Sequence, residues 1–250
     1  KGFVCNDDQN LKNIIRKTKN KNFYTYGKDK KSNFQIVNVK QTSNLSSFDI
    51  KINIPSKKKI IKRIKLPMIG IHNIRNATAA ISLAFTIGLP EKCIKAGIYN
   101  FKGVQRRFSH LFDYNNISFY DDYAHHPTEI SSVLSGVEKV YKNKEIVCVF
   151  QPHRISRVIS LKKEFSKCFK KADTVLLCPI YAANEKLRLN FTYHSFAKLI
   201  IKNSNVRLIQ VENELQLQKF IKQNVFGEKI YIGMGAGSIS NWMKNLKNIF

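Results

Sequence analysis

The stretch that decides the fold of this chain is Phe119-Tyr120-Asp121-Asp122-Tyr123-Ala124-His125-His126-Pro127-Thr128-Glu129. The apolar run 117–120 predicts a short buried strand, and Pro127 with the residues after it predicts the first turn of a helix. Two carboxylates and two imidazoles therefore lie where a strand passes into a helix. Ligands of open α/β sheets bind at the carboxyl ends of the strands, because the loops diverge there. This junction is a candidate ligand site.

A simpler interpretation of the junction stays open. Asp121 and Asp122 could form an acidic helix entrance favoured by the helix dipole, with both histidines as solvated turn residues. A metal site built from this stretch alone is disfavoured, because the adjacent side chains of His125 and His126 diverge and would not easily share one ion. Residues from elsewhere in the chain must decide between the two interpretations.

The sequence around the junction alternates between apolar runs and helical patterns. The runs predicted as strands cover residues 117–120, 145–150, 174–179, 206–210 and 229–232, and helical patterns follow at about 128–142, 156–171, 192–202, 212–224 and 238–248. Strict alternation of strand and helix predicts an α/β fold with a parallel, doubly wound sheet and right-handed crossovers.

Distinctive side chains follow the predicted strands at one rim of this sheet. Gln151-Pro152-His153-Arg154 and Arg157 follow the second strand, Tyr181 follows the third, and a glycine-rich run follows the last. Solvated loops would place such clusters at both ends of the strands, so their concentration at the carboxyl ends favours a ligand site. Arg154 and Arg157 are three residues apart at a helix start, so both can turn toward one anion such as a carboxylate.

The glycine-rich run is Gly233-Met234-Gly235-Ala236-Gly237-Ser238. It departs from a dinucleotide-binding fingerprint, because Ser238 stands where the third glycine should fall and no strand-helix-strand unit follows. We therefore favour tight packing over phosphate binding for this run.

The first hundred residues have a different pattern. A strand end at 2–5, a helix capped by Asp7 and carrying Leu11, Ile14 and Ile15, and short β runs at 22–26, 34–40, 48–54 and 60–66 are predicted. The β runs alternate apolar residues with lysine and predict a meander of antiparallel strands with one exposed face. We expect residue 1 to lie inside an α/β unit that begins earlier in a complete protein.

Asn73 and Asn76 precede a helix over 77–87 that is apolar on nearly every face and is predicted to be buried on most sides. The two amides share one face of the first turn, which favours an amide-reading role such as adenine recognition. The alternative makes Asn73 a helix cap and Asn76 an exposed residue. A further helix runs from Pro90 to residue 99, and a link at 101–108 carries Arg106 and Arg107, which could be surface charge or could clamp a phosphate.

Composition excludes some classes of protein. The chain has 250 residues and 43% hydrophobic content, enough for one large or two ordinary globular domains. The formal charge of +26 raises nucleic acid or an anionic membrane as partners. However, 34 of the 43 basic residues are lysine, and asparagine and isoleucine are abundant as well. This bias favours a solvated lysine surface and predicts no nucleic-acid and no membrane partner.

The five cysteines are scattered without a Cys-x-x-Cys pair, and several lie in apolar runs where a buried free thiol is expected. No signal-peptide pattern occurs at residues 1–10, and the longest apolar stretch, 77–89, is shorter than a membrane span of about 20 residues. We therefore predict a cytoplasmic protein.

These motifs together resemble the Mur ligases. The segments 121–129 and 151–154 with Arg157 are similar to those of the member that adds L-alanine, and Gly70-x-His72-Asn73-x-x-Asn76-Ala77, Arg106-Arg107-Phe108 and Gly235-Ala236-Gly237 resemble further family landmarks in the same order. The resemblance covers essentially the whole chain. It implies that residues 1–107 are the second part of a central ATPase domain and that residues 108–250 are a Rossmann-like C-terminal domain.

The resemblance also implies a chemistry. In the family, ATP converts the lactyl carboxylate of UDP-N-acetylmuramate into an acyl phosphate, which the alanine amine attacks. The phosphate loop, the domain that binds the UDP-sugar and the ligands of Mg²⁺ have no counterpart in this sequence, so no metal site is expected in it. The resemblance therefore implies an ATP- and Mg²⁺-dependent ligase whose partner is a missing N-terminal half, and which is inactive alone.

Residue roles are implied motif by motif. The resemblance implies that Asn73 and Asn76 meet adenine, that Arg107 meets the phosphates of ATP and that Asp122 meets its ribose. It implies that His125 positions alanine, that Arg154 and Arg157 hold the alanine carboxylate, and that the pocket is lined by Tyr123, His126 and His153. Two other function classes stay open: a basic protein that binds nucleic acid, and a module that binds an amino acid or a nucleotide without catalysis.

Overall fold

The computed structural model describes residues 1–19, 22–42, 44–55, 57–101, 103–186 and 192–250. It divides the chain into two compact units, Lys1–Gly103 and Val104–Phe250. The units meet four residues before the predicted domain boundary, so both arginines of the predicted link, Arg106 and Arg107, belong to the second unit. Residue 102 of that link lies outside the described residues.

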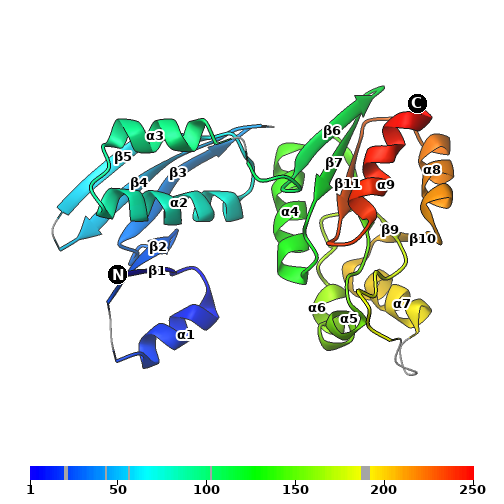
Figure 1. Cartoon of the computed structure of the whole chain (residues 1–250), viewed down its shortest axis with the longest axis horizontal. Helices are drawn as coiled ribbons and strands as arrows, with labels where there is room; N and C mark the ends of the chain where they lie inside the picture. Colours follow the sequence, from blue (N-terminus) through cyan, green and yellow to red (C-terminus); the bar gives the residue numbers. More distant parts are fainter. Residues whose placement is uncertain (20–21, 43, 56, 102, 187–191) are drawn as a thin grey trace. The chain divides into compact units, whose positions relative to one another are not determined.

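The first unit is built on one five-stranded sheet covered by helices (Figure 1). The strands lie in chain order and are β1 (Gly2–Cys5), β2 (Phe23–Gly27), β3 (Phe34–Gln41), β4 (Ser46–Ile54) and β5 (Lys57–Leu66). The helices are α1 (Gln9–Lys17), α2 (Ile71–Thr86) and α3 (Glu91–Tyr99). Side chains of β3, β4 and β5 pack with α2 in one apolar core that includes Phe34, Phe48 and Ile81.

The predicted antiparallel meander is correct only for β3, β4 and β5. β1 pairs parallel with β2, and β2 pairs parallel with β3 through Tyr26 and Phe34. A turn in which the Ser32 amide donates to the Asp29 carbonyl lies between β2 and β3, and the chain enters β3 beside the end of β2 without reversing direction. The alternation of apolar and polar residues predicts on which face of the sheet each side chain lies. It does not predict whether a strand runs parallel or antiparallel to its neighbour.

Two further predictions and one alternative interpretation for this unit are wrong. Asp8, not Asp7, is the N-cap of α1, because its carboxylate accepts the Leu11 amide at 2.9 Å. The N-cap of α2 is Gly70, so Asn73 does not cap that helix. Finally, α2 is not buried on most sides: Leu83 is 50% exposed, because the helix packs one face on the sheet and turns the other away.

Two bulges in this sheet share one anchor. Asn38 in β3 and Arg63 in β5 both have left-handed backbone angles, with φ of 53° and 55°. Asp49 lies between them on β4. Its carboxylate accepts a hydrogen bond from the side-chain amide of Asn38 at 2.8 Å and another from the backbone amide of Arg63 at 2.7 Å. One carboxylate therefore stabilises an irregularity in each neighbouring strand.

The second unit is a six-stranded sheet with helices on both faces (Figure 1). The strands are β6 (Ser109–Tyr114), β7 (Ile117–Asp122), β8 (Glu145–Phe150), β9 (Thr174–Leu177), β10 (Arg207–Gln210) and β11 (Lys229–Met234), arranged in the order β10-β9-β8-β11-β7-β6. The helices are α4 (Pro127–Val140), α5 (Ile155–Ser160), α6 (Lys162–Phe165), α7 (Tyr193–Ser204), α8 (Glu214–Gln223) and α9 (Ile239–Asn245), with a 3₁₀ turn at Leu246–Ile249.

The predicted parallel, doubly wound sheet is confirmed for β7 to β11. Two details differ from the prediction. β6 is an antiparallel edge strand that was not predicted; it forms a hairpin with β7 through Asn115, whose φ is 47°. The single helix predicted at 156–171 is broken at Leu161 into α5 and α6.

Strand register aligns the carboxyl ends at one rim. Asp122 of β7 is paired with Met234 of β11, which is paired with Phe150 of β8, and Phe150 is paired with Leu177 of β9. The loops after these strands therefore begin at the same level of the sheet. This common level brings together the clusters that are far apart in the sequence.

Three of the five thiols are buried as predicted: those of Cys148, Cys168 and Cys178. Cys5 is partly buried and Cys93 is exposed. Among the described residues, none of the helices has the length and apolar character needed to cross a membrane.

Candidate functional site

The carboxyl-end rim of the second unit carries the candidate site. Asp121 and Asp122 are the last two residues of β7 and are 1% and 2% exposed. The alternative in which they form an acidic helix entrance is therefore wrong. The rim is built instead from buried carboxylates that organise the loops around them.

Asp121 pairs with Arg106. Its Oδ2 atom lies 3.3 Å from Arg106 Nε and accepts the Ser240 hydroxyl at 2.6 Å. The Arg106 guanidinium also donates to the Gly235 carbonyl through Nη2 and lies 4.8 Å from the centre of the Tyr123 ring. One buried charge thus connects the link before β6, the end of β7, the glycine-rich run and α9. The sequence predicted either surface charge or a phosphate clamp for Arg106, and its pairing with Asp121 was not predicted.

Asp122 holds the loop on the other side. Its Oδ1 atom accepts the Ala124 amide and its Oδ2 atom accepts the Phe108 amide, both at 2.7 Å. Burial raises the pKa of Asp122 to about 6, although the two amides and the charge of Arg107 act in the opposite direction. Arg107 itself is exposed. The structure therefore brings together the two residues that were predicted to meet the ribose and the phosphates of ATP.

His126 begins α4. Its Nδ1 atom accepts the Thr128 amide at 3.3 Å, while Glu129 accepts the amides of His125 and His126 at 3.1 and 3.2 Å. This is a capping box with Pro127 at the first position of the helix. His126 therefore caps α4. That it also lines the alanine pocket stays a prediction.

A row of rings runs along the rim from β7 to β9. Tyr123 meets His125 edge-on at 5.2 Å between ring centres, and His125 lies 6.1 Å from His153. His153 stacks flat on Tyr181 at 5.5 Å with an angle of 8° between the planes. Three residues predicted for the alanine pocket, Tyr123, His125 and His153, are therefore neighbours. Tyr181, which was placed on the rim but given no role, completes the row.

The two histidines present different atoms. His125 Nδ1 lies 2.9 Å from the Tyr123 carbonyl, which can only accept, so Nδ1 carries a hydrogen and donates it. His153 Nδ1 faces Arg157 Nη1 at 3.3 Å, and a guanidinium can only donate, so Nδ1 is the acceptor there. Burial lowers the pKa of His153, and the charges of Arg157, His125 and Arg154 add to this effect. His153 is therefore a neutral ring with Nε2 as its donor.

Arg154 and Arg157 lie at the start of α5. Arg154 is exposed and has a φ of 66°, and its backbone N–H donates a hydrogen bond to the Tyr181 carbonyl at 2.9 Å. A left-handed conformation in a residue other than glycine costs of order 1 kcal/mol and is common in functional loops. Both arginines line one open hollow of about 550 Å³ that also includes Ser156 and Ser160. The structure therefore places both predicted carboxylate-binding side chains on the same surface.

The glycine-rich run packs closely against the loop after β8. A Cβ atom on Gly237 would lie 2.5 Å from Gln151 Oε1 and 2.7 Å from Tyr181 Cγ, and one on Gly235 would lie 2.6 Å from the Gln151 carbonyl. Gln151 is 3% exposed, and its Oε1 atom accepts the Ile239 amide at 3.0 Å. These contacts support the packing interpretation of the run and show a structural role for Gln151, which the sequence analysis named in its motif without giving it a role.

The asparagines predicted to read adenine lie in the first unit. Asn73 is 8% exposed, and its Nδ2 atom donates to the Ile69 carbonyl at 2.7 Å. That bond fixes the orientation of the amide. Asn76, one turn further along α2, is exposed as the alternative interpretation expected. Their predicted contact with adenine stays a prediction.

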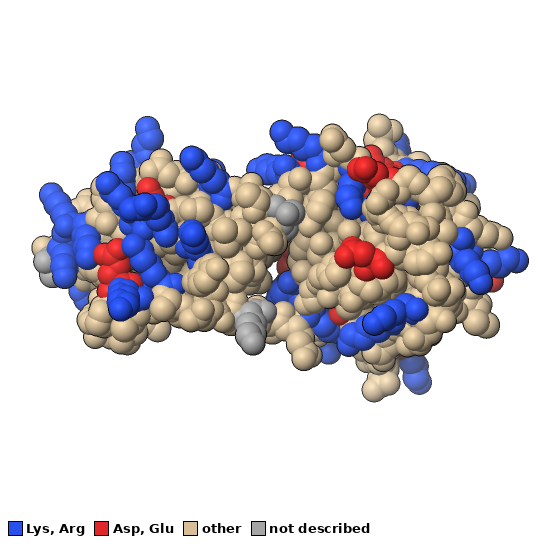
Figure 2. All heavy atoms as spheres, turned by 90° about the horizontal axis from the view of Figure 1, so that it is seen from above, with Lys and Arg blue, Asp and Glu red and all other residues tan. Residues whose placement is uncertain are grey.

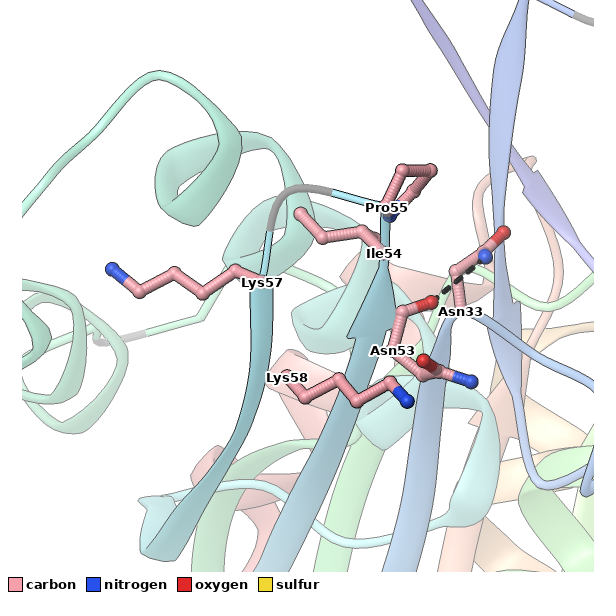
Figure 3. Close-up of a pocket in the computed structure, with 6 residues that line it drawn as sticks. All are labelled: Asn33, Asn53, Ile54, Pro55, Lys57 and Lys58. Carbon is pink, nitrogen blue, oxygen red and sulfur yellow. Dashed lines mark hydrogen bonds between the residues drawn. The ribbon is translucent and has the colours of Figure 1, made fainter.

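A second hollow, of about 560 Å³, lies in the first unit around the turn between β4 and β5. Figure 3 shows its lining residues, with the Asn33 side chain donating to the Asn53 carbonyl at 3.0 Å and Lys57 extending away from the others. None of the residues predicted to be functional lines it. Among the described residues, no group of three or more His, Cys, Asp or Glu side chains is arranged to hold a metal ion.

Comparison with known proteins identifies the family. A model of the Mur ligase middle domain matches residues 1–84, and a model of the Mur ligase glutamate ligase domain matches residues 106–225. The chain belongs to the Mur ligase family. The two matches fall on the two compact units. The first includes Asn73 and Asn76, and the second includes the rim residues from Arg106 to Tyr181 but not the glycine-rich run.

Relatives named UDP-N-acetylmuramate–L-alanine ligase match almost the whole chain. The Pelagibacter ubique protein is 59% identical over 250 residues, which are 100% of this chain and 54% of that protein. The Agrobacterium fabrum protein is 35% identical over 245 residues, which are 96% of this chain and 51% of that protein. This Mur ligase chain thus spans about half the length of the curated relatives that it matches, and it matches their C-terminal half.

Solved structures agree with the fold. The UDP-N-acetylmuramate-alanine ligase of Thermotoga maritima superposes with a TM-score of 0.70 at 27% identity, over 90% of this chain and 47% of that chain. The murein peptide ligase of Psychrobacter arcticus has a TM-score of 0.68 at 19% identity, over 99% of this chain and 50% of that chain. The second likeness concerns the fold alone.

Proposed function

We propose that this chain is the C-terminal half of an ATP-dependent ligase that joins L-alanine to UDP-N-acetylmuramate in the synthesis of peptidoglycan precursors in the cytoplasm. The observation that carries the proposal is the rim of the second unit. There, the imidazole rings of His125 and His153 lie in one row of rings, and His153 is followed directly by the two arginines at the start of α5. A small zwitterion needs one anion site and one amine site close together.

The arginines are suited to the carboxylate of alanine. Arg154 and Arg157 line the same hollow, and guanidinium groups bind carboxylates through paired hydrogen bonds. The amine would lie toward the rings, where Nε2 of His125, with Nδ1 engaged by the Tyr123 carbonyl, would accept a hydrogen bond from the amine when the ring is neutral. This contact would hold the amine in one orientation. Positioning of this kind, without a side-chain nucleophile, supplies much of the acceleration in bimolecular reactions.

For ATP, the contacts are proposed for each unit by itself. Asn73, whose Nδ2 is engaged by Ile69, would offer its Oδ1 to the adenine amino group, and Asn76 would lie beside it. Arg107 would meet the phosphates. Asp122 accepts one amide on each oxygen, and each oxygen has a second lone pair that a ribose hydroxyl can use. We propose that the phosphate loop, the Mg²⁺ ligands and the site for the UDP-sugar belong to the N-terminal half, which makes the chain inactive alone.

The alternative of a nucleic-acid-binding protein has less support. Figure 2 shows Lys and Arg side chains spread over the visible face of both units, with Asp and Glu among them, and not gathered in one stripe. The other alternative, a module that binds alanine without catalysis, would use the same rim of the second unit. It differs from the proposed ligase only in lacking the phosphate loop, the Mg²⁺ ligands and the UDP-sugar site that we assign to the N-terminal half.

The test is a joined ligase, in which the N-terminal half of the Pelagibacter relative is fused to Lys1 of this chain. We expect phosphate release that requires ATP, L-alanine and UDP-N-acetylmuramate, and none from the chain alone. Arg154→Ala should raise the KM for alanine at least about tenfold, because a charged hydrogen-bonded pair is worth about 1.5–3 kcal/mol. Arg207→Ala, at an exposed position on β10, is the matched control and should leave the KM unchanged.

Two results would contradict the proposal. Turnover by the isolated chain would mean that the phosphate site is not in the N-terminal half. An unchanged KM for alanine in Arg154→Ala would remove the proposed carboxylate site.

A further inference from the structure

The loop after β9 holds the loop after β8 at two points. The backbone amide of Tyr181 donates a hydrogen bond to the Pro152 carbonyl at 2.8 Å, and the backbone amide of Arg154 donates one to the Tyr181 carbonyl at 2.9 Å. These bonds form a short parallel bridge between His153 and Tyr181. The backbone that leads into Arg154 is therefore fixed from the neighbouring loop.

The N-terminus of α5 has an uncommon residue at its N-cap position. Helices usually carry Ser, Thr, Asp or Asn there, because the side-chain oxygen of these residues accepts a backbone amide of the first turn. In α5 the position is occupied by Arg154, and a guanidinium can only donate hydrogen bonds. Among the described contacts of this helix, the side chain of its own N-cap residue makes no capping bond. The acceptor for the first turn comes instead from another part of the chain.

Glu185, in the loop after β9, is that acceptor. Its Oε2 atom accepts the backbone amide of Ser156 at 2.8 Å, and its Oε1 atom accepts the Ser156 hydroxyl at 2.7 Å. The two residues are 29 positions apart in the sequence, so this cap is a tertiary contact. The hydrogen bonds from Ser156 lower the pKa of Glu185, and the charge of Arg154 adds to this effect. Glu185 is therefore a charged carboxylate at neutral pH.

The turn that carries Glu185 has an uncommon backbone. The Glu185 amide donates to the Ala182 carbonyl at 3.1 Å, and the two residues inside the turn, Ala183 and Asn184, have left-handed φ angles of 52° and 67°. Asparagine tolerates this conformation, but alanine adopts it rarely. Such angles persist only where the surrounding structure imposes them, and they cluster at binding and active sites. The turn and Arg154, whose φ is also left-handed, are strained backbone in two loops that contact each other.

We propose that Glu185 is a positioning residue for the alanine site: it caps α5 from the neighbouring loop, and so lets the N-cap position carry Arg154. A local cap residue at this position would satisfy the helix equally well, but it would remove the guanidinium. That this guanidinium binds the carboxylate of alanine rests on the proposed function. Glu185 would act through Arg154 and not by contact with the substrate.

Hydrogen exchange in the isolated chain tests the cap without any substrate. In Glu185→Ala the Ser156 amide should exchange at least about fivefold faster than in the parent chain, because its acceptor is lost. In Glu185→Gln, whose side-chain oxygen can still accept, it should exchange at nearly the parent rate. The Gln151 amide, which donates to the Met234 carbonyl at 2.9 Å, is the internal control and should be unchanged.

Two results of this experiment would overturn the cap. Unchanged exchange of the Ser156 amide in Glu185→Ala would mean that the carboxylate does not hold it. Equal acceleration at Ser156 and Gln151 would mean that Glu185 supports the whole unit and not the start of α5.

Alanine kinetics in the joined ligase test the effect on the site. Glu185→Ala should raise the KM for alanine about three- to tenfold and change kcat less than about twofold, because a misplaced binding group weakens substrate and transition state alike. Glu185→Gln should keep the KM within about twofold of the parent, because the cap is retained. Glu138→Ala is the matched control, since it removes an exposed carboxylate that pairs with Lys171 on the same unit, and it should leave the KM unchanged.

A double variant shows whether Glu185 acts through Arg154. If it does, Glu185→Ala combined with Arg154→Ala should have the same KM as Arg154→Ala alone. Effects that multiply would overturn the positioning role, and so would a parent KM in Glu185→Ala beside a raised KM in Arg154→Ala. An unchanged KM in Arg154→Ala contradicts the proposed function instead, and the Ser156 exchange then still decides the cap. The two failures can therefore be told apart.

Discussion

Replacing Asp121 by asparagine removes one negative charge from the rim and leaves its shape almost unchanged. Asp121 is 1% exposed and is the counter-charge of Arg106, whose side chain is 23% exposed. Loss of one partner from a buried pair costs about 3–5 kcal/mol when the other charge is left without compensation. In the variant, Arg106 still donates a hydrogen bond to the Gly235 carbonyl and still lies over the Tyr123 ring. We therefore expect a loss near the lower limit, about 3 kcal/mol of unfolding free energy.

The sequence supplies a selective probe for this measurement. Trp242 is the single tryptophan of the chain and packs against the core of the second unit, so its fluorescence in urea reports the unfolding of that unit. A loss of about 3 kcal/mol lowers the urea midpoint by about 1 M or more. Asp113→Asn is the matched control, because Asp113 is 63% exposed in its pair with His110 and should cost less than about 0.5 kcal/mol. An Asp121→Asn midpoint equal to that of the control would refute the role of the pair.

Two further predictions concern the same rim. The pKa of Asp122 in the folded state, about 6, lies above its unfolded value of about 3.9, so its contribution to stability is complete below pH 4 and is lost as the pH rises through 6. Acidification from pH 7 to 5 should therefore stabilise the second unit by about 1 kcal/mol through this group, and a carboxyl ¹³C titration with a midpoint below 4 would contradict this. Gly237→Ala should weaken alanine binding, because the added Cβ would lie 2.7 Å from Tyr181 Cγ and displace the ring that stacks on His153. Unchanged binding, with unchanged Trp242 fluorescence, would show that the position of Tyr181 does not matter.

Much of the second unit could be predicted from the sequence because its signals are local. Apolar runs followed by helical patterns marked β7 to β11, and parallel strands must align their carboxyl ends, so the neighbourhood of His125, His153 and Arg154 followed. The antiparallel strand β6 was missed, although Asn115-Asn116 between two runs with aromatic residues is a recognisable hairpin signal.

What could not be predicted depends on contacts between distant residues. The Arg106 and Asp121 pair joins the link to β7, and the packing of Gln151 against Gly237 joins two loops that are 86 residues apart in the sequence. Asp7 illustrates the same limit, because its position favours a helix cap while Arg75 and the Lys28 amide, both far away in the sequence, engage its carboxylate. Short-range patterns predict elements, but the partner of a polar side chain is decided by the tertiary fold.

The central claim, that the rim of the second unit binds L-alanine, is tested most directly by titrating the isolated chain with L-alanine and following its histidine resonances by NMR. We predict saturable shifts of His125 and His153, little change at the exposed His194 on α7, and loss of the shifts in Arg154→Ala. Absence of any shift in the parent chain, or shifts of the same size in Arg154→Ala, would contradict the claim.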